Sequence, residues 1–444
     1  MVRKYFGTDG IRGRANGVIT PDLALKVGQA AGLMFQQRGD YRHRVVIGKD
    51  TRLSGYMIES ALQAGFTSVG MDVLLLGPIP TPAVAMLTRS MRCDLGVMIS
   101  ASHNPYEDNG IKLFAADGFK LDDDTEHAIE AELDKPLEPP ERIGRVRRFH
   151  GALEDYLREL AGRFAELDLR GKRVLLDCAN GATYRAAPEI FRRLGADVEV
   201  LADQPDGRNI NLGCGSTHLE AVVEKGAGGS YDIAFAFDGD GDRVLAVDRR
   251  GAIVDGDELV ALAAIHLRER EMLPGDGVAV TVMTNYGFHT AMAAHGVNVA
   301  TTAVGDRYVL DELRRRGWAL GGEQSGHIID LGFGPSGDGI ASALLTLEAL
   351  GDRDLSERDA MQKLPQRLVN IRAPDRTALT AAMDDAAVKA AIEQEHGALA
   401  GRGRVLVRPS GTEPLIRVMV EAPSEREIDD VCGRLANIVE TALA

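Results

Sequence analysis

The sequence predicts an α/β protein made of several similar domains. Runs of strand type alternate with runs of helix type along most of the chain, a pattern typical of βαβ units around a mainly parallel sheet. The 444 residues exceed one ordinary core, because domains commonly hold roughly 100 to 200 residues. With 45% hydrophobic and 26% charged residues, the composition is that of a globular protein. We therefore expect three or four domains of related plan.

The first domain is expected to span residues 1–150. Its predicted elements are helices at 21–33 and 54–68 and strands at 44–48, 71–76 and 96–99. An acidic, proline-bearing region at 122–140 then loses the strand pattern, which places the boundary near residue 150.

Three further domains are expected at 151–255, 256–365 and 366–444. The second should contain strands at 173–177, 197–201 and 231–237 and a helix at 186–194. The third should contain strands at 278–282 and 297–302 and a helix at 307–315. The last should contain strands at 368–371, 404–407 and 415–420, one helix at 378–393 and a closing helix from Glu425.

Charge and cysteine usage exclude several classes of function. The net charge of −15 and the lack of a long Lys/Arg run argue against a nucleic-acid partner. The four cysteines are scattered without a CxxC spacing, which argues against zinc and against a disulfide framework. No signal-peptide core and no apolar stretch of about 18 residues is present, so we expect no membrane span and a cytoplasmic protein.

A serine stands where a strand-like run ends. Residues 96–105 read GVMISASHNP, so an apolar run gives way to small, polar and turn-forming residues. Ser102 would lie beyond the carboxyl end of its strand, where α/β folds place reactive groups. A plain surface turn is the alternative. His103 is interpreted as structural, because adjacent side chains in an extended loop generally point apart.

Three carboxylates follow the buried strand at 231–237. Asp238, Asp240 and Asp242 alternate with glycines, and their oxygens suit a hard cation such as Mg²⁺ or Ca²⁺. An EF-hand calcium loop is excluded, because Arg243 and Arg249 occupy the positions of the required glycine and glutamate. An acidic hairpin turn without metal stays open as the alternative.

Three further loops carry candidate binding groups among glycines. Residues 6–13 (FGTDGIRG) and 408–417 (RPSGTEPLIR) combine arginines with backbone amides that can cradle phosphate. Residues 321–328 (GGEQSGHI) offer a carboxylate, a hydroxyl and an imidazole suited to a sugar or an amine. This loop is not a nucleophile elbow, since Glu323 stands where a glycine is required. Each of the three is also compatible with an ordinary turn.

The motifs form a set that resembles the α-D-phosphohexomutase superfamily. The segments SASHNP at 100–105, DGDGDR at 238–243, GEQSGH at 322–327 and RPSGTEP at 408–414 occur in the order of that superfamily, one in each expected domain. The resemblance implies three similar mixed-sheet α/β domains plus a smaller α+β C-terminal domain around a central active-site cleft.

The resemblance also implies an isomerase. Residues 6–13 and Gln324 resemble the corresponding residues of one group of members. That group interconverts glucosamine 6-phosphate and glucosamine 1-phosphate, on the route to UDP-N-acetylglucosamine. A phosphoserine enzyme and a 1,6-bisphosphate intermediate are implied. Two alternatives stay open: a superfamily member that acts on mannose or glucose phosphates, and a non-catalytic sensor of phosphosugars.

Residue roles follow from the resemblance. The implied catalytic residues are Ser102 as phosphoserine, Arg12, Lys112 and His327, with Lys112 favoured over His327 as general base. The implied Mg²⁺ ligands are Ser102, Asp238, Asp240 and Asp242. The implied substrate-binding residues are Glu323, Ser325, Arg408, Ser410, Gly411, Thr412 and Arg417. Glucosamine 1,6-bisphosphate or glucose 1,6-bisphosphate is the implied activator, the partner is a small phosphosugar, and monomer and homodimer are both compatible with the sequence.

Overall fold

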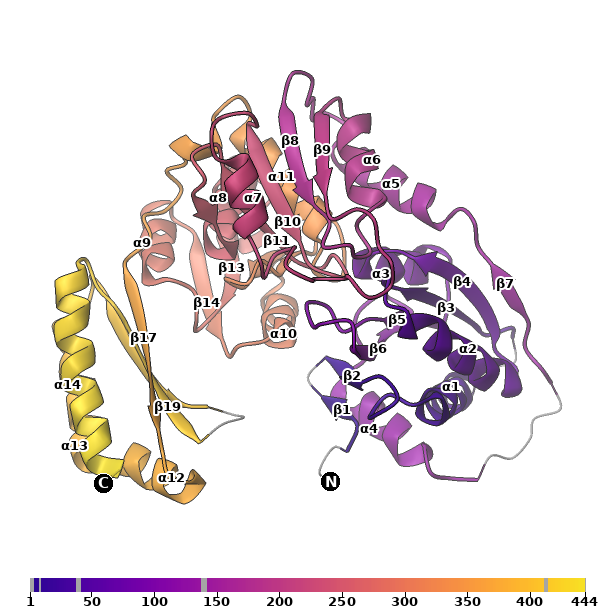
Figure 1. Cartoon of the computed structure of the whole chain (residues 1–444), viewed down its shortest axis with the longest axis horizontal. Coiled ribbons are helices and arrows are strands. Elements are labelled where there is room, and N and C mark those ends of the chain that lie inside the picture. The colour runs from indigo at the N-terminus through magenta and orange to yellow at the C-terminus, as the bar shows by residue number, and fades with distance from the viewer. Residues whose placement is uncertain (1–3, 8, 37–40, 137–141, 411–413, 444) are drawn as a thin grey trace. The chain divides into compact units, whose positions relative to one another are not determined.

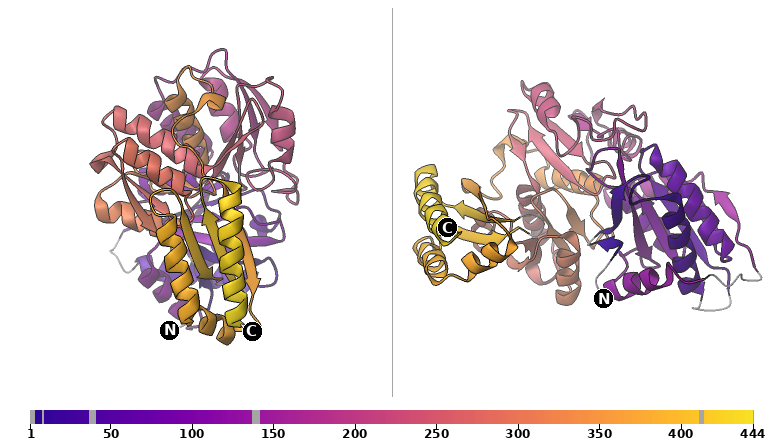
Figure 2. Two further views of the ribbon diagram at one scale, coloured as in Figure 1. Left: turned by 90° about the vertical axis from the view of Figure 1, so that its left-hand side faces the viewer. Right: turned by 60° about the horizontal axis from the view of Figure 1, so that its bottom comes forward.

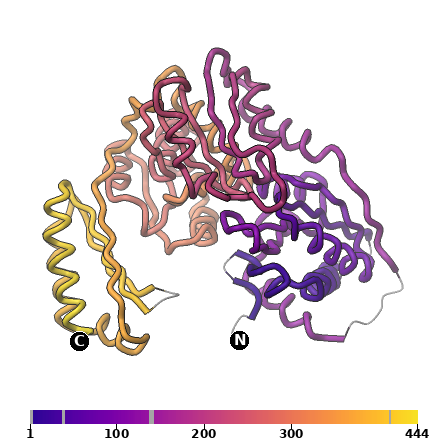
Figure 3. The backbone as a smooth tube through the Cα atoms, viewed as in Figure 1, coloured from indigo at the N-terminus to yellow at the C-terminus, as the bar shows by residue number. Residues whose placement is uncertain are grey.

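A computed structural model describes residues 4–7, 9–36, 41–136, 142–410 and 414–443 (Figure 1). The chain divides into two compact units. The first comprises Met1–Met283 and Val297–Arg358, and the second comprises Thr284–Gly296 and Asp359–Ala444. Three sheets belong to the first unit and one to the second, and Figure 3 lets the chain be followed through them in order.

The first sheet has seven strands in the order β1-β2-β6-β5-β3-β4-β7. The strands are β1 (Phe6–Gly7), β2 (Gly10–Arg14), β3 (Arg44–Lys49), β4 (Asp72–Pro78), β5 (Leu95–Ile99), β6 (Asp108–Ala115) and β7 (Val146–Arg148). The helices of this part are α1 (Pro21–Gln36), α2 (Ser54–Ser68), α3 (Thr81–Ser90) and α4 (Asp123–Glu132). The pairs formed by β3 with β4 and β5, and by β4 with β7, are parallel, whereas β5-β6, β2-β6 and β1-β2 are antiparallel.

This sheet is therefore mixed rather than mainly parallel. The reason lies in the serine loop, which joins Ile99 at the end of β5 to Asp108 at the start of β6. A connection this short can only return the chain antiparallel, because a parallel neighbour needs a crossover of about a dozen residues or more. The serine loop is thus the link between the parallel and the antiparallel parts of the sheet.

The second and third sheets complete the first unit. The second has the order β12-β11-β10-β8-β9 and the third β14-β13-β15-β16. The second contains β8 (Arg173–Asp177), β9 (Asp197–Leu201), β10 (Ile233–Phe237), β11 (Val244–Asp248) and β12 (Ile253–Val254), with α5 (Ala152–Arg163), α6 (Ala186–Arg193) and α7 (Glu220–Gly226) nearby in sequence. The third contains β13 (Gly277–Thr281), β14 (Asn298–Thr302), β15 (Leu320–Gly322) and β16 (Ile328–Asp330), with α8 (Gly256–Glu269), α10 (Asp306–Arg316) and α11 (Gly339–Leu350).

The second unit is a small antiparallel sheet in the order β17-β19-β18. It contains β17 (Gln366–Arg372), β18 (Arg404–Pro409), β19 (Leu415–Glu421), α9 (Tyr286–Ala294), α12 (Arg376–Asp384), α13 (Ala386–Ala398) and α14 (Glu425–Leu443). The left view of Figure 2 shows helices lying against one face of this sheet. Residues such as Val418, Leu435 and Val439 are fully or almost fully buried between the two layers.

One predicted element is wrong. The single helix expected at 378–393 is two helices, α12 and α13, that meet at Asp385. Asp385 has extended backbone angles, and its side chain accepts hydrogen bonds from the amides of Ala387 and Val388. Aspartate competes for backbone amides in this way, which favours a cap over a helix interior.

The remaining predicted elements are confirmed within a few residues, and so is the α/β fold class with a smaller α+β C-terminal part. The domain boundaries at 150, 255 and 365 stay predictions. All four cysteines are buried and free. Among the described helices, none combines the length and the apolar character that crossing a membrane requires.

Candidate active site

The serine loop presents Ser102 inside the first unit, next to the end of β10. The residue is only 1% exposed and has a φ of 53°, a left-handed conformation that is uncommon for residues other than glycine. Its Oγ donates a hydrogen bond to Oδ2 of Asp238 at 2.5 Å. The structure thus joins the serine loop of the first sheet to the aspartate loop of the second.

The expectation that His103 points away from Ser102 is wrong. Nδ1 of His103 lies 3.3 Å from the Ser102 hydroxyl oxygen. The expectation assumed an extended loop, whereas the left-handed turn at Ser102 changes the relative direction of the two side chains. Burial, with the charges of Arg243 and Arg12, lowers the pKa of His103 to about 4. The imidazole is therefore neutral at pH 7.

The three aspartates form a compact group of carboxylates. One oxygen from each of Asp238, Asp240 and Asp242 lies within 4.8 Å of the others, and all three residues are buried. They follow β10, whose five residues are all buried, so the strand fixes the start of the loop. Gly239 is required here, because a Cβ atom at this position would lie 2.5 Å from the carbonyl oxygen of Ser102.

The electrostatics of this group fit a bound cation. Burial, together with the charges of Asp242 and Asp240, raises the pKa of Asp238 well above its ordinary value. Oδ1 of Asp240 is buried without a hydrogen-bond partner among the described residues. Three crowded carboxylates with an unused oxygen could hold a metal ion, and oxygen ligands of this type suit a hard divalent cation.

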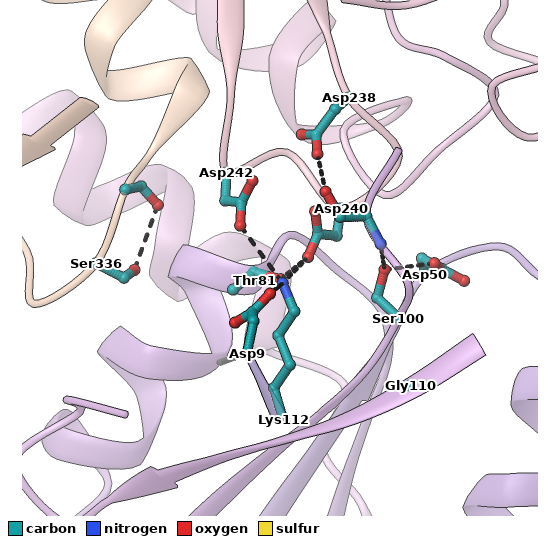
Figure 4. Close-up of polar contacts among 12 residues, drawn as sticks. Asp9, Asp50, Thr81, Ser100, Gly110, Lys112, Asp238, Asp240, Asp242 and Ser336 are labelled. Atoms are coloured by element: carbon teal, nitrogen blue, oxygen red, sulfur yellow. Dashed lines mark hydrogen bonds and ion pairs between the residues drawn. The ribbon is translucent and has the colours of Figure 1, made fainter. Parts of the chain in front are cut away.

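Lys112 projects from β6 into the same group (Figure 4). Its Nζ lies 2.8 Å from Oδ2 of Asp240, 3.4 Å from Oδ2 of Asp242 and 3.3 Å from Oδ2 of Asp9. Burial lowers the pKa of Lys112, but the charges of Asp240, Asp9 and Asp242 outweigh it and raise the pKa above its ordinary value. Arg12 on β2 pairs with Asp9 and so belongs to the same network.

His327 reaches the aspartate loop from the third sheet. Its Nδ1 lies 3.6 Å from Oδ1 of Asp242, and its Nε2 lies 3.6 Å from Oδ2 of Asp306. Burial lowers the pKa of His327, yet Asp242 and Asp306 outweigh it and raise the pKa above its ordinary value. A Cβ atom at Gly326 would lie 2.1 Å from the carbonyl oxygen of Val244, so this glycine permits the two loops to touch.

Two other predicted residues share the His327 loop. Oε1 of Glu323 accepts a hydrogen bond from the amide of Gly305 at 3.0 Å, while Ser325 is exposed. A pocket of about 280 Å³ lies beside this loop. Its lining includes Lys120, Asp306, Arg307, Arg314, His327 and Ser336.

The predicted phosphate-binding residues lie in the second unit. Arg408 and Arg417 face each other across the β18-β19 ladder, and the amide of Ser410 donates to the carbonyl of Leu415 at 2.8 Å. The buried Nε of Arg417 has no hydrogen-bond partner among the described residues. The predicted residues Gly411 and Thr412 lie outside the described residues.

Sequence reasoning gave no role to several charged and polar residues of the site. Asp9 contacts Arg12, Lys112 and Lys120, and Thr81 donates to Oδ2 of Asp240 at 2.6 Å. Asp306 also pairs with Lys120. Asp9 stands within the glycine-rich segment at 6–13, so its composition was a usable signal. The sequence gives no such signal for Thr81 and Lys120, because only the fold brings them to the site.

Comparison with known proteins matches the whole chain to one family. The four phosphoglucomutase/phosphomannomutase descriptions match it in order: alpha/beta/alpha domain I at residues 3–139, domain II at 154–251, domain III at 255–368 and the C-terminal domain at 368–438. A phosphoglucosamine mutase of Methylobacterium radiotolerans is 54% identical over 453 residues, covering 100% of each chain.

Solved structures share the fold. A phosphoglucomutase/phosphomannomutase family protein from Burkholderia thailandensis has a TM-score of 0.84 at 23% identity, covering 98% of this chain and 97% of its own. The N-acetylphosphoglucosamine mutase of Aspergillus fumigatus, in complex with GlcNAc-6P and magnesium, has a TM-score of 0.68 at 20% identity, covering 99% and 96%.

Proposed function

The chain belongs to the phosphoglucomutase/phosphomannomutase family, and from this membership we propose that it acts as a phosphoglucosamine mutase. The reaction is the interconversion of glucosamine 6-phosphate and glucosamine 1-phosphate, which serves the synthesis of UDP-N-acetylglucosamine. Full-length identity to a phosphoglucosamine mutase supports the substrate. The observation that carries the chemistry is the hydroxyl of Ser102, buried 2.5 Å from a carboxylate of a three-aspartate group.

Ser102 would serve as the carrier of the phosphoryl group. As phosphoserine it transfers this group to the free hydroxyl of the sugar monophosphate, so the bond to Oγ breaks as the bond to the sugar oxygen forms. A 1,6-bisphosphate results, turns end over end, and returns its other phosphoryl group to Ser102. Glucosamine 1,6-bisphosphate or glucose 1,6-bisphosphate would phosphorylate an unmodified enzyme by the same step, which makes either one an activator.

Asp238, Asp240, Asp242 and an oxygen of phosphorylated Ser102 would hold Mg²⁺. When bound, the cation neutralises charge on the transferring group, which is the main demand of phosphoryl transfer. Arg12 lies in the same network and would contribute a further positive charge. The structure of the Aspergillus fumigatus N-acetylphosphoglucosamine mutase was solved with GlcNAc-6P and magnesium, which supports the choice of metal.

The proton of the attacking hydroxyl needs an acceptor, and Lys112 and His327 are the two candidates. Asp240, Asp9 and Asp242 hold Lys112 protonated in the structure, because together they raise its pKa. A divalent cation held by Asp240 and Asp242 would offset the charges of these two carboxylates, which would lower the pKa of Lys112. Lys112 therefore remains our first candidate and His327 our second.

We predict that Lys112→Met lowers kcat by roughly 10²-fold or more, the usual contribution of a general base. Lys112→Arg is the informative control, because arginine keeps the positive charge but cannot give up its proton at accessible pH. If Lys112 accepts the proton, the arginine variant stays as slow as the methionine variant in steady-state assays. A kcat for Lys112→Arg close to that of the parent assigns the base to His327 instead.

One group of residues would bind the sugar hydroxyls of the substrate, and another would bind its phosphate. Glu323 and Ser325 would hold sugar hydroxyls, and these contacts suit either orientation of the bisphosphate. Arg408, Ser410, Gly411, Thr412 and Arg417 would anchor the phosphate that is not reacting. Arginine suits this role, because its planar fork binds phosphate oxygens in pairs.

We predict that Arg417→Ala raises KM by roughly 10- to 100-fold, the range expected for a lost charge-assisted hydrogen bond of about 1.5 to 3 kcal/mol. Arg367→Ala is the matched control, since Arg367 lies on β17 of the same sheet and pairs with Asp429 and Glu425. Initial rates against glucosamine 6-phosphate concentration measure both. An unchanged KM for Arg417→Ala removes this residue from the phosphate anchor.

Turnover of three substrates tests the function. The phosphates of glucosamine, glucose and mannose are compared with Mg²⁺ and a trace of 1,6-bisphosphate, and the highest kcat/KM is expected for glucosamine. A preference for mannose or glucose would reassign the chain to another member of the family. No turnover of any of the three, after priming with bisphosphate, would favour a phosphosugar sensor. The cytoplasmic location and the oligomeric state stay predictions.

A further inference from the structure

Four buried side chains that have no role in the proposed mechanism form hydrogen bonds with the serine loop or with one another. We propose that Asp50, Arg52, Ser100 and Asn211, here called the anchor group, position the nucleophile Ser102. This inference rests on the proposed function, because it assigns these residues a part in the phosphoryl transfer of Ser102. None of the four would touch the substrate, so they are positioning residues.

Arg52 makes the largest number of contacts. Its side chain is fully buried, and its Nη2 donates to the carbonyl oxygens of Ser102 and Asn104, both at 2.9 Å. Its Nη1 donates to the carbonyl oxygen of Pro105 at 2.5 Å. One guanidinium therefore ties together three backbone groups of the loop. Bonds from a charged donor are stronger than bonds between neutral groups, which makes this an effective clamp.

Asp50 links Arg52 to the amide side of Ser102. Its Oδ2 accepts from Nε of Arg52 at 2.8 Å and from the hydroxyl of Ser100 at 2.6 Å. The Ser100 oxygen in turn accepts a hydrogen bond from the amide of Ser102 at 2.9 Å. Figure 4 shows the Asp50 and Ser100 side chains facing each other. Asp50 directly follows β3, so the chain of bonds ends on the rigid sheet.

Asn211 supplies the second attachment, from the segment between β9 and α7. Its Nδ2 donates to the carbonyl oxygen of Ser102 at 2.9 Å and to that of Asn104 at 3.0 Å. Each of these two carbonyls thus accepts from both Arg52 and Asn211, which uses both lone pairs of each oxygen. The serine loop is fixed to the first and second sheets at once.

This double attachment explains the backbone of Ser102. A φ of 53° is uncommon for a residue with a Cβ atom, and it persists only where the surroundings determine it. The anchor group determines it by bonding both the amide and the carbonyl of Ser102. The same conformation directs Oγ to Asp238, so a loosened loop would misplace the phosphoryl group relative to the substrate. A displacement of about 1 Å commonly costs 10²-fold in rate.

The test compares Arg52→Met with Lys49→Met. Lys49 is also a buried cation, on β3 opposite Ile99 at the start of the serine loop, but its Nζ pairs with Glu59 at 2.6 Å and, within the described part of the chain, makes no hydrogen bond to that loop. Phosphorylated protein is mixed with glucosamine 1-phosphate, and transfer is followed in a single turnover alongside kcat, KM and thermal unfolding. Arg52→Met is expected to slow transfer by 10²-fold or more with KM within threefold of the parent, and Arg52→Lys to recover part of the rate.

Lys49→Met is expected to lower the unfolding temperature while leaving the transfer rate within threefold. If Arg52→Met does not fold, Asn211→Ala decides, with an expected tenfold or greater loss of transfer rate at unchanged KM. Folded Arg52 and Asn211 variants that transfer at the parent's rate would overturn the inference and leave the proposed function standing. A parent protein that carries no phosphate on Ser102 and transfers none would overturn both.

A second inference comes from a basic pocket of about 270 Å³ in the first unit. It is lined by Arg42, Arg44, Asp72, Val73, Leu74, Arg145 and Arg147. Four arginines and one aspartate thus line this pocket, in a chain whose net charge is −15. Arg42 pairs with Asp72, whereas the exposed side chains of Arg44, Arg145 and Arg147 have no ion-pair partner among the described residues.

The register of the strands explains why residues from three strands line one pocket. Arg44 on β3 pairs with Asp72 on β4, and Leu74 on β4 pairs with Arg147 on β7. Asp72 and Leu74 are two residues apart, so they and their partners share one face of the sheet. Arg148 pairs with Leu75 and therefore faces the other side. The pocket lies toward the amino ends of these strands, whereas Ser102 follows the carboxyl end of β5.

The geometry points to a binding site for a small anion with two adjacent phosphoryl groups. Each planar guanidinium can bind two phosphate oxygens, so several arginines around one small pocket can bind more oxygens than a single phosphate offers. Neutralising three unpaired cations at once also favours a multiply charged ligand. The site is separate from the residues that would bind the sugar phosphate.

Calorimetric titration with inorganic pyrophosphate tests this site, with Mg²⁺ and saturating glucosamine 6-phosphate present so that the catalytic site is filled. The parent and the control Arg148→Glu are expected to bind one pyrophosphate, and Arg147→Glu to bind it at least tenfold more weakly. Both variants carry the same change in net charge. Equal weakening in both, or no binding to the parent, would overturn the assignment.

Discussion

Replacing Ser102 by alanine is expected to abolish turnover while leaving the fold intact. The residue is the only carrier in the proposed mechanism, so its loss removes the covalent step and should lower kcat by roughly 10⁴-fold or more. The fold should survive, because alanine is smaller than serine and the backbone bonds of residue 102 to Ser100, Arg52 and Asn211 do not involve its side chain.

Two measurements check this expectation. Intact mass with peptide mapping should find one phosphoryl group on Ser102 of the parent after treatment with 1,6-bisphosphate, and none on Ser102→Ala. Steady-state assays should find no mutase activity in the variant. Ser90→Ala, at the exposed end of α3, serves as the control and should behave like the parent. Near-normal turnover of Ser102→Ala would remove Ser102 from the mechanism.

Replacing Asp238 by asparagine is expected to abolish the response to Mg²⁺ without destabilising the metal-free protein. Folding raises the pKa of Asp238, so this carboxyl favours stability at low pH and loses that contribution as the pH rises through its folded pKa. Asparagine resembles the protonated carboxyl and lacks this pH dependence. The variant should therefore be at least as stable as the parent at neutral pH without metal.

Metal binding reverses the comparison. A ligand that binds only the folded state stabilises it by about 2.7 kcal/mol at 100 times its Kd. The parent should therefore gain thermal stability on addition of MgCl₂, and Asp238→Asn should gain little. Turnover should fall by roughly 10²-fold or more in the variant, and in the parent treated with a chelator until Mg²⁺ is restored.

Asp232→Asn is the matched control for this experiment. Asp232 precedes β10 just as Asp238 follows it, but it is half-buried and pairs with Arg249 at 2.8 Å. Its substitution should leave both the Mg²⁺-induced rise in unfolding temperature and the turnover unchanged. An equal Mg²⁺-induced rise in Asp238→Asn and in the parent would show that Asp238 is not a ligand.

Much of the fold could be predicted from local patterns. The helix expected at 54–68 is α2 with the same bounds, and the strand expected at 231–237 contains the fully buried β10. These elements are predictable because their periodicity and apolar content act within a few residues. The prediction of a single helix at 378–393 was wrong, because the side chain of Asp385 accepts hydrogen bonds from two backbone amides and so begins a second helix.

The candidate site was predictable where a motif concentrates its chemistry. Ser102 and the three aspartates stand at the ends of strand-like runs, and the structure brings them together. Asp306 and Thr81 were not predictable, because each is a single polar residue in an ordinary context. Their relevance comes from contacts with residues far away in the sequence, such as the bond from Thr81 to Asp240.

The sequence alone determined the succession of strands and helices, the family and the residue types available for phosphoryl transfer. Only the tertiary structure decided the left-handed backbone of Ser102, the approach of His103 to its hydroxyl and the burial of Arg52 beneath the loop. The physical reason is the separation along the chain between the residues that interact. Periodicity and turn chemistry act between near neighbours, whereas burial, charge pairing and pKa depend on which distant segments share a water-excluded space.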